Sequence, residues 1–229
     1  MPAPLCVVIP TLNAADVLVE TAEILVSGVM EGVIGSLVVS DGGSTDATLD
    51  VARALGAEIV EGPAGRGGQI ARGVAAAEAE WVLILHADTH LGAHWLEAVA
   101  RHMSQFRDQA GYFQLSFRAR GLAPALVAMG ANARSKLFGL PYGDQGLLVR
   151  RVVLNAVGGV PEVPLMEDVA LARALRGRLR MLEAEAATSA ERYLRDGWGR
   201  RVLRNLWVLA RYFLGVSPDV LAKSYERNR

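Results

Sequence analysis

The carboxylate of Asp88 follows a run of apolar residues, 81–85, that is too short to form a helix. Parallel strands buried on both faces read as continuous apolar runs, and open α/β sheets bind ligands beyond the carboxyl ends of their strands. Asp41 repeats the arrangement upstream, after the short strand-like run 36–40. The pattern predicts a nucleotide or metal site where these strands end. The alternative is that Asp88 only caps the next helix.

Three carboxylates suit three different chemical tasks. Asp41 can accept a hydrogen bond from a base N–H, which is how a pocket reads uracil. Asp88 can bind Mg²⁺ or Mn²⁺, hard cations that use few protein carboxylates together with substrate phosphates. Asp168, beside Glu167 at the start of a predicted helix, is a candidate general base, because a carboxylate can take a proton as a bond forms.

The elements that must position these residues alternate along the first half of the chain. Apolar runs predict strands at residues 5–9, 36–40, 57–61 and 81–85. Helices are expected at residues 14–30, 47–55 and 69–79. Pro10 is expected to end the first strand, because proline cannot continue a central strand. This alternation predicts a parallel sheet with right-handed crossovers. Its loops at one edge would gather Thr11, Asp41, Arg66 and Asp88.

The second half of the chain is less regular. Alternating residues at 111–117 predict a half-exposed strand that crosses the ligand-bearing end of the sheet. A short strand is expected at 146–149, and helices are expected at 95–106, 124–138 and 166–176. The predicted fold class is α/β, with a mostly parallel central sheet flanked by helices and a C-terminal helical segment. One domain is expected over residues 1–229.

Composition excludes disorder and gives no sign of nucleic-acid binding. The 229 residues are 52% hydrophobic, and 24 Lys or Arg balance 24 Asp or Glu. The charge is uneven, because residues 191–229 hold nine Lys or Arg against four Asp or Glu, a net of +5. A basic tail can meet phosphates, a membrane surface or an acidic partner. With no signal peptide or uncharged 18-residue apolar run, the expected location is cytoplasmic, with peripheral contact at the inner membrane face left open.

The basic tail contains one strongly amphipathic helix. Its apolar residues recur at helical spacing at Leu203, Leu206, Trp207, Ala210, Phe213 and Leu214. Several arginines, including Arg201 and Arg204, share the same helix. The favoured interpretation is that the apolar side packs on the domain and the basic side is solvated.

Several motifs in one order resemble the inverting glycosyltransferases of family 2, which have the Rossmann-like GT-A fold. The motifs are Pro10-Thr11-Leu12-Asn13, Asp41-Gly42-Gly43-Ser44-Thr45-Asp46, His86-Ala87-Asp88-Thr89, Gly143-Asp144-Gln145, Leu165-Met166-Glu167-Asp168 and Gly215-Val216-Ser217-Pro218. The resemblance is to a small bacterial subgroup of soluble enzymes with largely unassigned acceptors. It implies a nucleotide-binding half at 1–110, an acceptor and catalytic half at 111–190, and basic amphipathic helices at 191–229.

The resemblance also implies roles for nucleotide-binding residues. Asp41 would bind the uracil N3–H, while Pro10, Thr11 and Asn13 would line the base and ribose. Arg66 would approach the base or the diphosphate. Asp88, the surviving carboxylate of the family's Asp-x-Asp motif, would hold Mg²⁺ or Mn²⁺ on the diphosphate. His86 stands where many relatives carry the first Asp of that motif.

For the transfer step, the resemblance implies that Asp168 deprotonates the acceptor hydroxyl, with Glu167 in support. Asp144 and Gln145 would face the donor sugar or the acceptor, and Arg192 would meet the phosphates. The implied partners are a nucleotide-sugar donor, such as a UDP-sugar, and an unidentified acceptor that is lipid-linked, anionic or neither.

Two other functions are alternatives, a nucleotidyltransferase and a non-catalytic nucleotide-sugar-binding protein. A nucleotidyltransferase would carry a Gly-rich loop with a Lys after the first strand, which residues 11–15 lack. A zinc site at His86, His90 and His94 is disfavoured, because the chain has no His-Glu-x-x-His signature.

Overall fold

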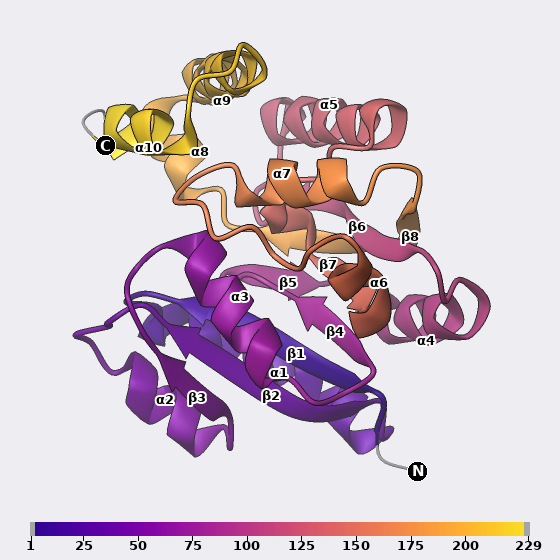
Figure 1. Cartoon of the computed structure of the whole chain (residues 1–229). Helices are drawn as coiled ribbons and strands as arrows, with labels where there is room; N and C mark the ends of the chain where they lie inside the picture. The colour runs from indigo at the N-terminus through magenta and orange to yellow at the C-terminus, as the bar shows by residue number, and fades with distance from the viewer. Residues whose placement is uncertain (1–2, 227–229) are drawn as a thin grey trace.

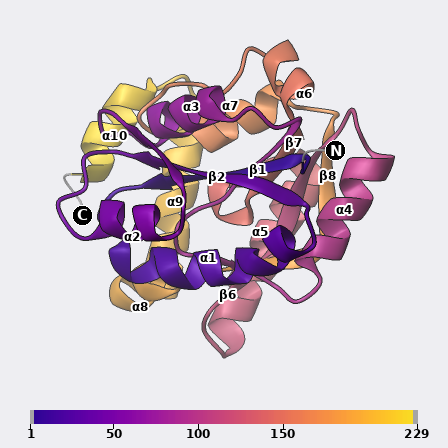
Figure 2. The same cartoon turned by 90° about the horizontal axis from the view of Figure 1, so that it is seen from below.

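The computed structural model describes residues 3–226. In this range one eight-stranded sheet has the order β3-β2-β1-β4-β7-β6-β8-β5, and helices cover both of its faces (Figures 1 and 2). The strands are β1 (Leu5–Thr11), β2 (Ile34–Asp41), β3 (Glu58–Glu61), β4 (Trp81–Ile84), β5 (Thr89–Leu91), β6 (Ala110–Phe117), β7 (Leu147–Arg150) and β8 (Leu179–Thr188). The helices are α1 (Ala15–Met30), α2 (Thr48–Ala54), α3 (Arg66–Ala76), α4 (Trp95–Gln105), α5 (Leu122–Phe138), α6 (Arg151–Ala156), α7 (Glu167–Ala174), α8 (Glu191–Asp196), α9 (Trp198–Phe213) and α10 (Pro218–Glu226), with a 3₁₀ turn, η1 (Gly143–Gln145).

The first half of the sheet is parallel, as predicted. β3, β2, β1 and β4 pair in parallel, and Thr11 at the end of β1 lies opposite Asp41 at the end of β2. β1 is buried on both faces because Val7 belongs to the core beneath α1 while Val8 belongs to the core beneath α3. The continuous apolar run therefore reflects two cores, one on each side of the strand.

The second half makes the sheet mixed, yet four of its seven strand pairs are parallel, so the sheet is mostly parallel, as predicted. β7 pairs antiparallel with both β4 and β6, and β5 pairs antiparallel with β8, while β6 and β8 are parallel. The prediction missed β5, β8 and α6. The inward positions of β8 include Ala184 and Ala186. Alanine is a poor strand former, so the alternation in β8 lacks the usual β-branched signature.

Two further expectations about strands are wrong. β6 is largely buried between β7 and β8, where Phe113 is fully inaccessible, and it is not a half-exposed strand. β1 continues through Pro10 to Thr11. The carbonyl of Val8 accepts a hydrogen bond from the N–H of Leu85, so the polar groups of Val8 face β4. Pro10, two residues on, faces the same side beyond the end of β4, where no N–H is needed.

Helix α9 is oriented opposite to the prediction. Arg201 is buried, and its guanidinium bonds Asp196 at 3.1 Å and the hydroxyl of Tyr225. The side chains of Leu203 and Trp207 are 69% and 63% exposed. Arg201 and Arg204 take the inner side because α8 and α10 offer them polar partners there. The apolar stripe consequently faces outward.

Candidate active site

The loop after β2 is organised by the carboxylate of Asp41, which is fully buried. One oxygen accepts from the hydroxyls of Thr11 and Ser44 at 2.8 and 2.6 Å, and the other accepts from the backbone N–H groups of Gly43 and Ser44 at 2.8 and 2.7 Å. Burial by itself raises the pKa of Asp41, but the hydrogen bonds from Ser44, Thr11 and Gly43 outweigh it and lower the pKa. Asp41 is therefore an ionised anchor whose four acceptor sites are filled by its own chain.

Asn13 ties the loop after β1 to the loop after β2. Its backbone is in the left-handed region, with φ 50°, and its side-chain oxygen accepts from the N–H of Thr45 at 2.8 Å. Its own N–H donates to the hydroxyl of Ser44 at 2.8 Å. The structure thus brings Pro10, Thr11, Asn13 and Asp41 to one edge of the sheet.

Gln69 on α3 is a residue of this edge that the sequence analysis missed. Its buried amide donates to the carbonyls of Thr11 and Ser40 at 2.6 and 3.2 Å and accepts from the N–H of Gly65 at 3.1 Å. A Cβ on Gly42 would lie only 2.9 Å from the Gln69 amide nitrogen, so the glycine leaves room for this side chain. The side chain therefore joins the ends of β1 and β2 to the start of α3. A glutamine inside a helix carries no sequence signal for this role.

The first turn of α3 places Arg66 beside the acidic start of α7. The helix begins at Arg66, three residues before its predicted start. Gly67 lies close to the 161–163 loop, because a Cβ on Gly67 would be only 2.5 Å from the carbonyl oxygen of Pro161. The Arg66 guanidinium lies 3.7 Å from the Glu167 carboxylate. Burial alone lowers the pKa of Arg66, but the charges of Glu167, Asp168 and Asp88 raise it. Arg66 is therefore a firmly charged cation at the centre of the site.

The loop after β4 supplies His86 and Asp88. Burial, together with the charges of Arg66 and Arg192, lowers the pKa of His86 well below its usual value, so the ring is neutral near pH 7. Its Nε2 has no hydrogen-bond partner and lies against Gly143, where a Cβ would be 2.6 Å away. Within residues 3–226 the half-buried carboxylate of Asp88 has neither a hydrogen bond nor an ion pair. Asp88 is thus free to bind a ligand.

The start of α7 presents Glu167 and Asp168 side by side. Asp168 accepts from the N–H of Gly143 at 2.9 Å and from the N–H of Val169 at 2.7 Å, which leaves acceptor capacity on its carboxylate. Burial and the neighbouring charge of Asp168 raise the pKa of Glu167, despite Arg66. Met166, just before the helix, has φ 67°, a strained conformation for a non-glycine residue. This turn directs both carboxylates into the site.

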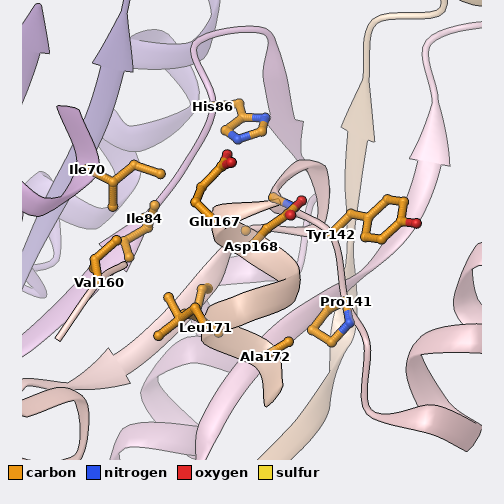
Figure 3. Close-up of a pocket in the computed structure, with 13 residues that line it drawn as sticks. Ile70, Ile84, His86, Pro141, Tyr142, Val160, Glu167, Asp168, Leu171 and Ala172 are labelled. Carbon is orange, nitrogen blue, oxygen red and sulfur yellow. The ribbon is translucent and has the colours of Figure 1, made fainter. Parts of the chain in front are cut away.

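Figure 3 shows the Glu167 carboxylate pointing toward the His86 ring, while the Asp168 carboxylate points toward the backbone at Tyr142. Beneath them lies a cavity of about 40 Å³ whose floor is apolar and includes Ile84 and Leu171. A cavity of this size has room for a few water molecules.

The 3₁₀ turn η1 carries Asp144 and Gln145 toward different surroundings. Burial, with the charges of Asp168 and Asp88, raises the pKa of Asp144 to about 6 despite Arg134, and its Oδ1 has no hydrogen-bond partner. The Gln145 amide is fully buried and donates to the carbonyl of Phe113 at 3.0 Å. Asp144 thus has an oxygen available for a ligand. Gln145 holds the turn, and a direct contact between Gln145 and a sugar stays a prediction.

The C-terminal segment reaches the same edge through Arg192 on α8, whose positive charge acts on His86. Phe117, Tyr193 and Trp198 hold α8 in place, with ring centroids 4.8 to 5.1 Å apart. The structure therefore gathers Arg66, Asp88, Asp144, Glu167, Asp168 and Arg192 around one site.

The residues at this edge fit a divalent cation that is shared with a ligand. Within residues 3–226 no group of three or more His, Cys, Asp or Glu is placed to hold a metal ion alone. His90 lies away from such a role, with its Nε2 3.4 Å from Glu20 and 3.2 Å from Arg118. The unpartnered carboxylate of Asp88 fits Mg²⁺ or Mn²⁺, which take few protein carboxylates and complete their coordination with phosphate oxygens and water.

The fold and motifs agree with comparisons to known proteins. S. aureus TarS (residues 1–349) matches with a TM-score of 0.60 and 19% identity, over 82% of this chain and 61% of that chain. Glucosyl-3-phosphoglycerate synthase from Mycobacterium tuberculosis, solved with Mn²⁺, UDP and glucosyl-3-phosphoglycerate, matches with a TM-score of 0.60 and 20% identity, over 80% of this chain and 71% of that chain. At these identities the likeness is one of fold.

The sequence comparison reaches further, to the family. A search of curated proteins finds no match. The sequence model for glycosyl transferase family 2 matches residues 6–128, which is more than half of the chain. This match covers the loops that carry Asp41, Arg66 and Asp88, and it confirms the family indicated by the motifs. The chain belongs to glycosyl transferase family 2.

Proposed function

We propose that this chain is an inverting glycosyltransferase that moves a sugar from a UDP-sugar to an acceptor hydroxyl, with Mg²⁺ or Mn²⁺ on the donor diphosphate. The observation that carries the proposal is the unpartnered carboxylate of Asp88 beside Arg66 and Asp168 at the edge where the strands end. Proteins of the same fold have been solved with UDP, UDP-GlcNAc, Mn²⁺ and Mg²⁺, which supports this donor and these metals.

The nucleotide half, residues 1–110, would bind the donor through the two loops that Asp41 and Asn13 hold together. Pro10, Thr11 and Asn13 would line the base and ribose. The Asp41 oxygens already accept four hydrogen bonds, so a uracil N3–H would share an oxygen with an existing donor. The first task of Asp41 is therefore to shape the loop against which the base binds.

The leaving group would be held between Arg66 and Asp88. As the bond from the anomeric carbon to the diphosphate breaks, its electron pair goes to the diphosphate oxygen. The Arg66 guanidinium stabilises this growing negative charge, and Asp88 would hold the metal. The metal, when bound, supplies further positive charge to the diphosphate.

The acceptor half, residues 111–190, would supply the base. An Asp168 oxygen takes the proton of the acceptor hydroxyl while the acceptor oxygen attacks the anomeric carbon from the side opposite the diphosphate. This single displacement inverts the anomeric configuration. Glu167 keeps Arg66 in place, and Asp144 offers an acceptor for a sugar hydroxyl. Arg192, in the helical segment 191–229, would assist with the phosphates.

A lipid-linked or anionic acceptor and a cytoplasmic location at the inner membrane face complete the proposal. They rest on the net charge of +5 in residues 191–229 and on the approach of Arg192 to the site.

The test is turnover of UDP-sugars by the full chain with Mn²⁺, followed as UDP release with water as the acceptor. Proton NMR of the freed sugar should show that the α-linked donor first yields the β-anomer. First release of the α-anomer would overturn the inverting mechanism. Donor binding without any turnover would favour the alternative, a non-catalytic nucleotide-sugar-binding protein.

A further inference from the structure

Helix α9 presents its apolar stripe to solvent. Leu203, Trp207 and Leu214 lie on one side of the helix and are 69%, 63% and 80% exposed. The opposite side carries arginines with partners inside the protein. Arg204 bonds the backbone carbonyl of Tyr225, and Arg211 bonds the hydroxyl of Ser224. Because these bonds fix the rotation of α9, the apolar stripe cannot turn inward without breaking them.

A second apolar stripe lies on α5, which contacts α9. Leu122, Leu126 and Met129 recur at helical spacing on one side of α5 and are 84%, 60% and 63% exposed. Helices α5 and α9 contact each other and lie at the same end of the molecule, at the top of Figure 1, far from β2 and β3. We call Leu122, Leu126, Met129, Leu203, Trp207 and Leu214 the two-helix face. A monomeric soluble protein rarely leaves so many large apolar side chains together in water.

The charge of the chain distinguishes between the surfaces that could cover this face. Residues 111–229 hold 19 Lys or Arg against 10 Asp or Glu, a net of +9, whereas residues 1–110 hold 5 against 14, a net of −9. Lys136 on α5 and Arg200 on α9 are exposed beside the two-helix face. A second copy packed on the same face would bring two positively charged halves together. An anionic bilayer attracts those charges.

The side chains also suit the depth of a membrane interface. Trp and Phe favour the boundary between lipid headgroups and acyl chains, and interfacial helices place Leu and aromatic residues below that boundary with Lys and Arg above it. Trp207 and Phe213 on α9 are both exposed. Within residues 3–226 no helix is long and apolar enough to cross a bilayer. Docking parallel to the surface is the arrangement that these helices permit.

We propose that the two-helix face docks on an anionic lipid bilayer, with its apolar side chains inserted in the interface and Lys136 and Arg200 at the headgroups. This inference deepens the membrane location in the proposed function by naming the surface that docks, and it is tested separately from catalysis, because docking needs neither donor nor metal.

The test is sedimentation of the full chain with vesicles of phosphatidylcholine alone and of phosphatidylcholine with phosphatidylglycerol, at low and high salt. The double variant Leu203→Gln with Trp207→Gln removes two inserted side chains. The matched control, Val26→Gln with Val29→Gln on α1, replaces two side chains that are 54% and 57% exposed on the acidic half. All four side chains are exposed, so both variants should melt close to the wild type.

We expect wild type and control to bind the anionic vesicles, with a blue shift of Trp fluorescence and weaker binding at high salt. The Leu203→Gln, Trp207→Gln variant should bind at least about tenfold more weakly. Absence of wild-type binding, or equal binding by both variants, would overturn the proposal. The proposal would also be overturned if light scattering showed that the wild type is a dimer and that only the α9 variant dissociates it, because a second copy would then cover the two-helix face.

Discussion

The two halves of the molecule treat charge in opposite ways. In residues 3–110 the apolar side chains fill the core on both sides of a parallel sheet, and the buried carboxylate of Asp41 is held by hydrogen bonds from neighbouring loops. In residues 111–226 a guanidinium, that of Arg201, is buried beside α8 and α10, and large apolar side chains such as Trp207 face solvent. The proposed donor site lies at the sheet edge of the first half, and the proposed membrane-docking face lies on the second half.

The contrast shows that the site is shared between a pre-organised side and an adaptable side. The loops around Asp41 and Asn13 have their hydrogen bonds already made, so the proposed donor binding there would need little rearrangement. On the proposed acceptor side, Asp144 has an unpartnered oxygen and a raised pKa. A buried polar atom without a hydrogen-bond partner gains the most free energy when a ligand supplies one, because neither water nor protein satisfies that atom beforehand.

The largest effect expected in either half is on catalysis. Asp168→Asn should lower UDP release from a UDP-sugar by about 10² to 10⁴-fold, since it removes the proton acceptor while keeping the size of the side chain. UDP should bind with unchanged affinity, measured by titration calorimetry. The control is Glu162→Gln, an exposed residue ahead of α7, which should keep full activity. Normal turnover by Asp168→Asn would assign the base to another residue.

The inverted helix α9 makes a prediction about stability. Arg201→Ala should lower the free energy of unfolding by about 2 to 3 kcal/mol, because the substitution breaks the bonds of a buried guanidinium to Asp196 and Tyr225. Leu206→Gln, on the exposed stripe of the same helix, should change it by less than about 0.5 kcal/mol. Urea unfolding measures both. If Leu206→Gln proves the more destabilising, the apolar side of α9 packs on the protein and the described orientation is wrong.

A smaller effect should follow pH. The pKa of Asp144 in the folded protein is about 6, above its usual value of 3.8, so the folded state binds that proton more tightly than the unfolded chain does. Between those two pH values the contribution of Asp144 to the free energy of unfolding falls as pH rises. The Asp144→Asn variant has no carboxyl group to ionise at this position, so its free energy of unfolding at pH 8 should exceed that of the wild type by about 1 to 2 kcal/mol.

Urea unfolding of wild type and Asp144→Asn at pH 8 and near pH 4 checks the sign. The difference should vanish near pH 4, where Asp144 is largely protonated in the fold. Asp108→Asn, an exposed residue, serves as the control and should show no difference at either pH. An equal gain at both pH values would mean that the carboxylate of Asp144 is not the cause.

The sequence predicts the first half better for a physical reason. Asp41 ends β2 and Asp88 lies in the loop after β4, and both follow apolar runs, so the change from apolar to acidic residues marks the sheet edge. Gln69 could not be predicted, because its role depends on backbone carbonyls contributed by two distant strands.

The second half could not be predicted because its patterns are ambiguous. Helical periodicity in α9 identifies an amphipathic helix but says nothing of which side faces the protein. That choice depends on Asp196 and Tyr225, which lie on neighbouring helices. Likewise β8 alternates through alanines, which helices favour.

Asp88 is proposed to hold a metal-bound nucleoside diphosphate, and thermal stabilisation by UDP tests this role. Wild type and Asp88→Ala are compared, each with UDP alone and with UDP and Mn²⁺. At about 100 times its dissociation constant, UDP with Mn²⁺ should add about 2.7 kcal/mol to the stability of the wild type. Most of this gain should be lost without Mn²⁺ and in Asp88→Ala. Equal stabilisation of both proteins, or stabilisation that needs no metal, would contradict it.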